Sequence, residues 1–254
     1  MFKTLNADRA TIERKYHHPD KPYDGFRRMA YHGYDYDAAT GLTDEQIQEG
    51  LAELAVRLEG QPHPVVKAEM FAYILDNTRI DVNASDYFVG IYSWNRLLSP
   101  FTVDKWEREV NATFPEESTL MGKLEDSGAG LGWLDYDHTI PDWDSLMELG
   151  FPGILKRAEA AFAKLEASGT VTQKQRDFFR GVQTEYRAVI RLLDRWYHYA
   201  LTKDFEKAPA IADCLKQLRD GAPRNTYEAM QLIYIYFMLS ESVEIGRASC
   251  RERV

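Results

Sequence analysis

The segment APRNTYEAMQLIYIYFML, residues 222–239, decides how the chain folds. Pro223 breaks the preceding helix, and Asn225 or Thr226 is a side chain of the type that caps a new one. The helix that follows has apolar side chains all round, whereas a surface helix has them on one face. We therefore expect this helix to lie centrally in the packed structure. We also expect it to expose a wide apolar surface if the polypeptide ends here.

Upstream of this segment the chain is a succession of amphipathic helices. Thr43 with Gln46, and Thr172 with Gln175, form the pattern of a capping box. After Thr172, apolar residues recur in steps of three, four and one, which places them on one buried helix face. These residues are Phe178, Phe179, Val182, Tyr186, Val189, Ile190, Leu193, Tyr197, Ala200 and Leu201. Further helices are predicted at residues 44–59, 65–77, 102–110, 145–149, 152–168 and 205–218, so the chain is mainly α.

Two segments depart from this succession of uninterrupted helices. Residues 150–153, GFPG, interrupt a helix that Asp142 or Asp144 caps, and Pro152 restarts it. Residues 79–94, RIDVNASDYFVGIYSW, are rich in β-branched and aromatic side chains. They form the best candidate for a strand.

The composition is that of a globular protein with a core of its own. The 254 residues are 44% hydrophobic and 28% charged, which suits one large domain or two small ones. Forty acidic residues against 31 basic ones give a formal net charge of −9, so nucleic-acid binding is not expected. The N-terminus has no apolar signal segment, and the longest apolar run, residues 232–239, cannot span a bilayer. We expect a cytoplasmic protein without a membrane anchor.

The C-terminal residues 244–254, EIGRASCRERV, break the pattern of the preceding helix. They agree, residue for residue, with the translation of a common short-read sequencing adapter. We therefore expect residues 245–254 to be foreign to the natural protein, whose polypeptide then continues past Val243. Cys250 is foreign as well on this reading, which leaves Cys214 as the one native cysteine and excludes a disulfide framework.

One loop gathers residues of the kind that bind metals. Asp135, Asp137 and His138 lie close together in sequence, with Asp142 and Asp144 beyond them. Carboxylates and an imidazole can hold a cation, but no second histidine lies at ligand spacing. Because acidic residues before a helix are ordinary caps, we predict no metal site.

The other chemically active side chains suggest no catalytic constellation. Asp194 and His198 lie one helical turn apart, which is a common solvent-face pair. The glycine-rich residues 127–132, SGAGLG, lack the Lys-Ser/Thr of a phosphate-binding loop. Cys214 lies on the apolar side of a helix, where a buried structural thiol is favoured over a reactive one. From the residues alone, no catalytic residue is predicted.

Three stretches, in this order, resemble the N-terminal third of the pyruvate formate-lyase-like glycyl radical enzymes. Residues 80–90, IDVNASDYFVG, are similar to a short family segment that ends in an apolar residue, Val and Gly. Residues 137–159, DHTIPDWDSLMELGFPGILKRAE, are similar to a segment with His-Thr, Pro/Asp and a helix that reaches Gly-apolar-x-Gly-Ile. Residues 222–237 are similar to the family's Pro-x-x-Thr-aromatic-Glu-Ala-x-Gln helix.

The resemblance implies a fold and a division of the chain. It implies a ten-stranded α/β barrel of two half-barrels, wrapped by helices, of which this mainly α chain supplies the N-terminal part. Residues 1–243 are then the truncated N-terminal part of the pyruvate formate-lyase-like domain. Residues 244–254 are the non-native tail.

The resemblance also implies radical chemistry on a small organic substrate. In the family, an activating enzyme with an iron–sulfur cluster and S-adenosylmethionine places a radical on a glycine, which generates a thiyl radical on a barrel cysteine. The thiyl radical then starts the cleavage of a C–C, C–O or C–N bond, as in formate acetyltransferases and diol or amine lyases. Family members are commonly homodimers. This chain has neither the cysteine-loop motif nor the glycyl-loop motif. We expect both in the missing C-terminal part, so the fragment binds no cofactor and is inactive.

The resemblance suggests one residue of this chain, His138, as a substrate-binding candidate. In some family members a histidine of the His-Thr segment reaches the substrate pocket, and His138 stands at that position. The alternative is that His138 caps the following helix or bonds within its loop. For the whole chain, the alternative function is a helical interaction or regulatory module without chemistry of its own.

Overall fold

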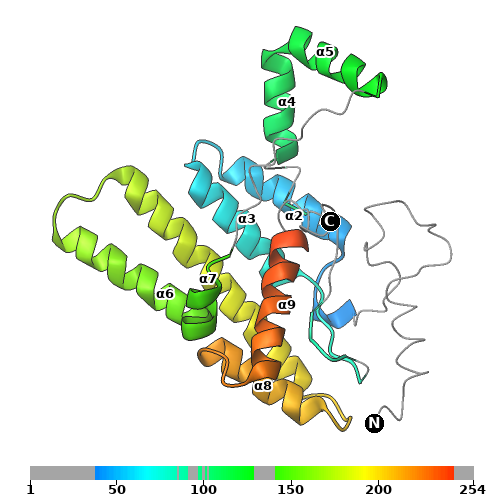
Figure 1. Cartoon of the computed structure of the whole chain (residues 1–254), viewed down its shortest axis with the longest axis vertical. Helices are drawn as coiled ribbons and strands as arrows, with labels where there is room; N and C mark the ends of the chain where they lie inside the picture. The colour runs from blue at the N-terminus through cyan, green and yellow to red at the C-terminus, as the bar shows by residue number, and fades with distance from the viewer. Residues whose placement is uncertain are drawn as a thin grey trace.

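The structure is a computed structural model that describes residues 38–84, 86–90, 97–98, 101, 103–128 and 141–242. Within these residues the chain is helical, which confirms the predicted class, and it contains no strand (Figure 1). One isolated parallel bridge joins Leu42 to Thr78. The elements are η2 (Ala38–Thr40), α2 (Asp44–Arg57), α3 (His63–Asn77), α4 (Val103–Thr113), α5 (Pro115–Asp126), α6 (Trp143–Ala167), α7 (Gln173–Ala200), α8 (Ala208–Asp220) and α9 (Thr226–Ser242).

The long helix α7 organises the described part of the chain. It packs against α3, α6 and α8, while α9 lies on α8 and α2 lies on α3. The hairpin of α4 and α5 projects away from these helices (Figure 1). No helix among the described residues is both long enough and apolar enough to cross a membrane.

The predicted capping boxes are confirmed. The hydroxyls of Thr43 and Thr172 accept bonds from the backbone N–H groups of Gln46 and Gln175, whose side chains accept in return. Asp142 caps α6 through the N–H of Ser145, at 3.0 Å, which decides between the two aspartates that the sequence offered. These bonds satisfy N–H groups that the first helical turn leaves without partners.

The predicted apolar face of α7 is only partly right. Val189, Leu193 and Ala200 are buried as expected, but Phe178 and Leu201 are more than half exposed. Helices pack against more than one side of α7, so its buried surface is broader than one amphipathic stripe. The buried residues of α7 are Gly181, Ala188, Val189, Leu192, Leu193, Trp196 and Ala200.

The interruption of α6 occurs where the sequence predicts it. Gly150 has φ 62° and ψ 179°, which takes the backbone out of the helix, and the helix resumes through Pro152. Glycine adopts positive φ at little cost, whereas a side chain is strained there. The break also lets the Gly150 backbone approach Gly221, because a Cβ at residue 150 would lie 2.5 Å from the Gly221 carbonyl oxygen.

The predicted strand at residues 79–94 is wrong for the part that the structure describes. Residues 79–84 and 86–90 form turns and irregular backbone, and residues 91–94 lie outside the described residues. Aspartate side chains compete with strand pairing here: Asp81 accepts from the Val82 N–H at 2.8 Å, and Asp86 accepts from the Asn83 N–H at 2.8 Å. Local bonds of this kind give the backbone an alternative to a sheet ladder.

Arg195 of α7 holds the end of α3 against the residues around η2. Its guanidinium donates to the carbonyl oxygens of Leu75, Thr40 and Thr78 at 2.6, 2.7 and 2.6 Å. The helix end leaves such carbonyls without partners inside the helix, and a charged donor bonds them strongly. One side chain therefore joins segments that are far apart in the sequence.

We predict that Arg195→Met lowers the free energy of unfolding by about 2–4 kcal/mol, because three carbonyl groups lose a charged donor. Urea denaturation measures this loss. Arg191→Met is the matched control, since Arg191 pairs with Asp76 at 2.7 Å near the surface and its loss costs under about 1 kcal/mol. Equal losses in the two variants would contradict the role given to Arg195.

Candidate functional site

The three stretches that resemble family segments meet at α9 in the structure. Residues 86–90 lie against one side of α9, the break in α6 lies against the loop that enters α9, and α9 itself carries the third stretch. The first and third stretches are about 140 residues apart in sequence, so their contact is a product of the fold. We take this junction as the candidate site, and call it the α9 junction.

Gln231 is the polar centre of the α9 junction. Its side-chain amide accepts from the Val89 N–H at 2.7 Å and donates to the Val89 carbonyl oxygen at 2.7 Å. Both residues are buried, with 1% of Gln231 and none of Val89 exposed. The amide thereby supplies the two bonds that a neighbouring strand would make. The backbone at Val89 can be buried without a sheet.

Gly90 continues this contact along α9. Its φ of 122° lies in the region that L side chains rarely adopt, and a Cβ there would lie 2.9 Å from the Met238 sulfur. The Tyr234 hydroxyl donates to the Gly90 carbonyl oxygen at 3.3 Å. The Phe88 ring lies 5.8 Å from the Tyr227 ring and 6.0 Å from the Tyr234 ring, between centroids. Residues 88–90 are thus held by rings, packing and backbone bonds together.

Two buried aspartates shape the turn before Val89. Asp81 and Asp86 are 8% and 6% exposed, and both carboxylates bond groups within residues 81–86. Burial raises the pKa of Asp81, and the negative charge of Asp86 adds to the rise. Lys207, the N-cap residue of α8, donates to the Asp86 carbonyl oxygen at 3.3 Å and lies over the Tyr87 ring.

The second stretch reaches the α9 junction from the other side. Its Gly150 approaches the Gly221 backbone, and Gln217 donates to the neighbouring Ala222 carbonyl oxygen at 2.7 Å. The Trp143 ring lies 5.4 Å from the Tyr236 ring and 5.6 Å from the Phe237 ring. The start of α6 and its break therefore both contact the third stretch.

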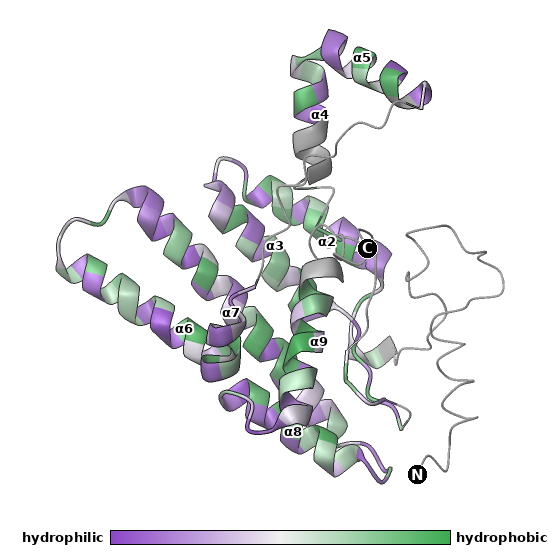
Figure 2. Ribbon diagram, viewed as in Figure 1, coloured by the Kyte–Doolittle hydropathy of each residue, from purple (hydrophilic) through white to green (hydrophobic). Residues whose placement is uncertain are grey.

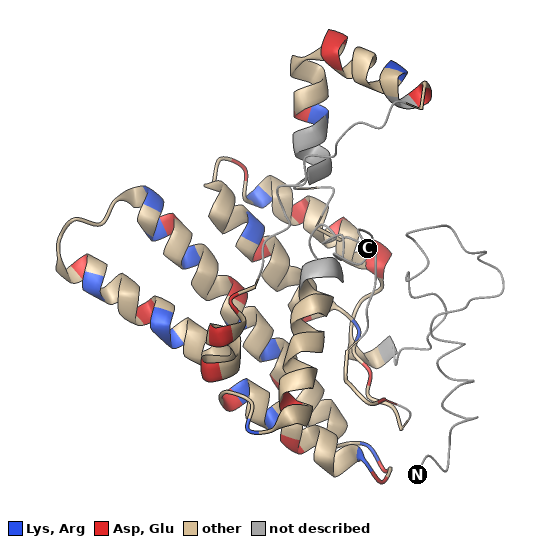
Figure 3. Ribbon diagram, viewed as in Figure 1, with Lys and Arg blue, Asp and Glu red and all other residues tan. Residues whose placement is uncertain are grey.

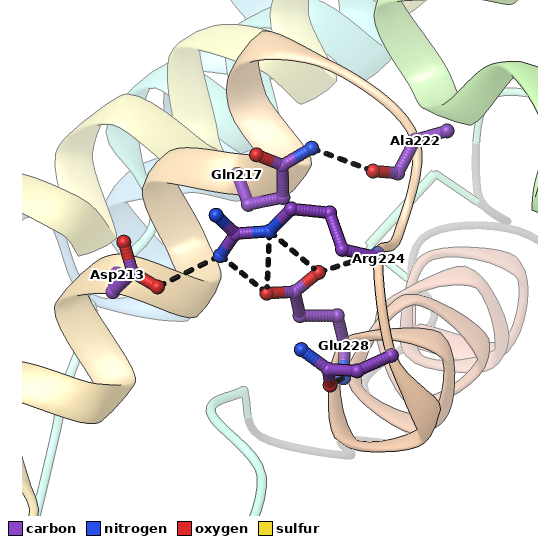
Figure 4. Close-up of polar contacts among 6 residues, drawn as sticks. Asp213, Gln217, Ala222, Arg224 and Glu228 are labelled. Carbon is purple, nitrogen blue, oxygen red and sulfur yellow. Dashed lines mark hydrogen bonds and ion pairs between the residues drawn. The ribbon is translucent and has the colours of Figure 1, made fainter.

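An ion pair between buried Glu228 and half-exposed Arg224 fixes the first turn of α9 (Figure 4). Glu228 is 2% exposed, and its carboxylate accepts from the Arg224 backbone N–H and from the Arg224 Nη2, each at 2.6 Å. Arg224 also pairs with Asp213 of α8 at 2.7 Å. Burial by itself raises the pKa of Glu228, but the bonds from Arg224 outweigh it and hold this pKa below its ordinary value. Asn225 caps α9 by accepting from the Glu228 N–H at 3.1 Å.

The structure describes only some of the site residues that the sequence suggested. His138, Asp135 and Asp137 lie outside the described residues. Cys214 is buried, at 2% exposure, and burial raises the pKa of its thiol to about 12, as suits a structural thiol. Asp194 and His198 lie 3.4 Å apart at the surface.

The polar side chains of the α9 junction bond the backbone of neighbouring segments. Its polar groups are engaged with one another, and the residues that the structure describes include no group of three His, Cys, Asp or Glu side chains that could hold a metal ion. Sequence reasoning missed the roles of Gln231 and Glu228. The sequence does show one amide and one acid inside an otherwise apolar helix. Because polar side chains are buried only when they have hydrogen-bond partners, these two residues could have been singled out.

Comparison with known proteins gives a family and a fold. A family model described as pyruvate formate lyase-like matches residues 34–254. A glycyl radical enzyme from Archaeoglobus fulgidus has 18% identity and a TM-score of 0.59, over 78% of this chain and 32% of that one. No curated protein sequence matches the chain.

Two further structures match with lower scores. Hydroxyproline dehydratase from Clostridioides difficile, solved with trans-4-hydroxy-L-proline bound, has 13% identity and a TM-score of 0.51 over 80% of this chain and 32% of its own. The B12-independent glycerol dehydratase from Clostridium butyricum, in a glycerol-bound form, has 18% identity and a TM-score of 0.50 over 78% and 33%. The chain spans about a third of the length of these structures.

We predict that Gln231→Leu lowers the free energy of unfolding by about 2–4 kcal/mol, because the buried N–H and C=O of Val89 lose their partners. Urea denaturation measures the loss. Gln173→Leu is the matched control, since Gln173 is exposed on the first turn of α7 and its change costs under about 0.5 kcal/mol. A Gln231→Leu variant as stable as the wild type would contradict the role given to the bonds between Gln231 and Val89.

The contribution of Glu228 to stability should depend on pH. Because the folded-state pKa of Glu228 is depressed, its contribution to stability is present above the unfolded-state pKa and is lost as the pH falls through the folded-state pKa. Glu228→Gln should therefore be less stable than the wild type at pH 7, by about 1–2 kcal/mol because half-exposed Arg224 leaves the pair partly screened by solvent. This difference in stability should narrow as the pH falls below about 4.

Urea denaturation of both proteins from pH 7 to pH 3 measures this difference. Glu159→Gln is the control, because Glu159 pairs with Arg187 at the surface and its change has a small effect. A stability difference for Glu228→Gln that stays constant over the whole pH range would contradict the role of the Glu228–Arg224 ion pair.

Proposed function

Because the chain belongs to the pyruvate formate lyase-like family, we propose that it is the N-terminal part of a glycyl radical enzyme. The family match over residues 34–254 carries this proposal. The likeness in fold to three glycyl radical enzyme or dehydratase structures supports it. In this proposal the described helices belong to the outer layer around a ten-stranded barrel.

The radical chemistry belongs to the polypeptide beyond residue 243. A glycyl radical there supplies hydrogen-atom abstraction through a thiyl radical, and both residues need a closed site that excludes water. Cys214 does not suit the thiyl role, because its side chain lies on the buried face of α8, is 2% exposed and has a raised pKa. The chain by itself is therefore inactive. In this proposal residues 245–254 are foreign although the family match extends over them, and they lie outside the described residues.

The reaction is the cleavage of a C–C, C–O or C–N bond in a small organic molecule. Two of the matched structures are dehydratases, which supports C–O cleavage among these classes. The partners are a radical S-adenosylmethionine activating enzyme with an iron–sulfur cluster and a second copy of the full-length chain. The protein works in the cytoplasm.

His138 binds the substrate in this proposal. It stands in the stretch whose neighbouring residues, Trp143 and Gly150, contact the last two turns of α9 and the loop that enters it. That contact places the start of α6, five residues after His138 in the sequence, at the α9 junction. A neutral or charged imidazole there donates a hydrogen bond to a hydroxyl or carboxylate of the substrate.

A helical interaction or regulatory module remains the second candidate function. The α9 junction contains no reactive pair of its own, which is the observation that favours this candidate. It differs from the first in what the gene encodes after codon 243 and in whether the complete protein forms a radical.

We predict that the genomic locus continues in frame past codon 243, without the codons for residues 245–254, and encodes a barrel cysteine and a glycyl loop. The complete protein, incubated anaerobically with its activating enzyme, then gives a carbon-centred radical signal in electron paramagnetic resonance. The 254-residue chain gives none under the same conditions. A genomic stop codon within a few codons of 244 would establish the interaction module instead.

In the complete enzyme, His138→Ala should lower kcat/KM by about 10–100-fold, the effect of one lost hydrogen bond to a polar substrate group. His198→Ala is the control, since His198 lies exposed on α7. A radical signal of unchanged size in both variants separates substrate binding from activation. Equal kcat/KM values in His138→Ala and the wild type would leave His138 as a loop or capping residue.

A further inference from the structure

Helix α5 presents its apolar side to solvent and a polar side to its neighbour. Ser118 donates a hydrogen bond to the side chain of Asn111 on α4 at 2.8 Å, and α4 is the element that α5 chiefly contacts. At 100° per residue, Leu120 and Leu124 lie about 160° and 120° round the helix from Ser118. Both are exposed, at 58% and 37%. A surface helix ordinarily does the reverse, because burial of its apolar side is what stabilises it.

Three apolar side chains of α5 form one exposed surface. Leu120, Met121 and Leu124 fall within an arc of about 100° on the helix, and Met121 is 46% exposed. We call these three residues the α5 stripe. The hairpin that carries them projects away from the other helices, and Figure 2 shows hydrophobic residues on α5 between hydrophilic ones. Exposed apolar side chains that gather in one place are typical of a protein interaction site.

The α5 stripe lies between acidic residues. Residues 114–126 contain four acidic residues and one lysine, and acidic residues lie at both ends of α5 (Figure 3). Glu116 and Glu117 stand in the first turn, where the helix dipole favours a negative charge. Asp126 is the last residue of α5, where the same dipole disfavours a negative charge. Helix stability therefore does not account for an acid at that end.

The acidic side chains beside the α5 stripe are available to a partner. Glu116, Glu117 and Asp126 are exposed, and no ion pair joins any of them to another residue that the structure describes. Glu159 and Glu166 of α6, by contrast, are paired with arginines of α7. A basic partner at α5 would therefore meet carboxylates that the described cations leave unpaired.

We propose that the α5 stripe is the docking surface for a basic amphipathic helix of another protein. The apolar stripe of one helix packs against the apolar stripe of a second helix. Lysines or arginines beside the partner's stripe would pair with Glu117 and Asp126, which gives the contact its specificity. The proposal goes beyond the function proposed above and does not depend on it.

The charges around the α5 stripe disfavour two other occupants. A second copy of α5 would bring two acidic helices together, and an anionic membrane surface would repel the same carboxylates. Three side chains on one short helix bury less area than a permanent interface needs. The contact should therefore be transient and steered by charge.

The probe for the test is a synthetic helical peptide of leucine and lysine, with leucine along one helix face. A control peptide of the same composition has its leucines spread round the helix. Fluorescence anisotropy measures the binding of each peptide to the 254-residue chain. The Leu/Lys peptide should bind at least about 10-fold more tightly than the control peptide, and its affinity should fall at least about 10-fold between low salt and about 0.5 M salt.

Variants of the α5 stripe locate the binding. Leu120→Ser with Leu124→Ser should weaken binding of the Leu/Lys peptide at least about 10-fold, because two apolar contacts are lost. Val56→Ser is the matched control, since Val56 is a 73% exposed apolar residue of α2 and its change should leave the affinity unaltered. A photoreactive leucine in the peptide should cross-link to residues 114–126. Circular dichroism checks that each variant keeps the helix content of the wild type.

Charge reversal tests the acidic side chains. Glu117→Lys with Asp126→Lys should weaken binding at least about 10-fold at low salt and much less at about 0.5 M salt. Glu53→Lys with Glu59→Lys is the control, because it changes the net charge equally at exposed positions on and just after α2. An equal loss of affinity in the two double variants would contradict the role given to the carboxylates of α5.

Three further results would overturn the proposal. If the Leu/Lys peptide binds the doubly substituted stripe as tightly as the wild type, or cross-links outside residues 114–126, the α5 stripe is not the docking surface. If the control peptide binds as tightly as the Leu/Lys peptide, only net charge is recognised. If sedimentation shows a dimer that Leu120→Ser with Leu124→Ser dissociates, the occupant is a second copy of the chain.

Discussion

The backbone N–H and C=O of Val89 are buried, and the described residues offer them no neighbouring strand to pair with. The α9 junction depends on another partner for these two groups. A buried N–H or C=O without a partner costs on the order of 1–3 kcal/mol, so the two groups together would weaken the contact of residues 86–90 with α9. The Gln231 amide bonds both groups. Once this contact is fixed, Gly90 packs on Met238, and Phe88 packs between two tyrosines of the same helix.

Short-range features could be predicted from the sequence because their partners are a few residues apart. The capping boxes at Thr43 and Thr172 join residues three apart, and the glycine break at Gly150 needs only a residue that tolerates positive φ. The contact of Gln231 with Val89 spans 142 residues, so no local pattern reports it. The strand prediction failed because the carboxylates of Asp81 and Asp86 bond the backbone that a strand would need.

The candidate site was predictable in its parts but not in its geometry. Three stretches were recognised separately by their resemblance to family segments, and the structure brings them together at one helix. The roles of Glu228 and Gln231 follow only from burial, because an acid and an amide inside a helix become informative once their surroundings are known. The residues that would carry radical chemistry lie, in our proposal, in polypeptide beyond this chain, and the described part serves to position backbone around α9.

Native-state hydrogen exchange of the Val89 amide tests the α9 junction most directly. If the Gln231 side chain holds this N–H, the amide exchanges only through global unfolding, with the same free energy as core amides of α7 such as Leu192 and Leu193. Exchange of Val89 at the rate of an exposed loop amide, while the α7 amides remain protected, would contradict the central place given to this bond.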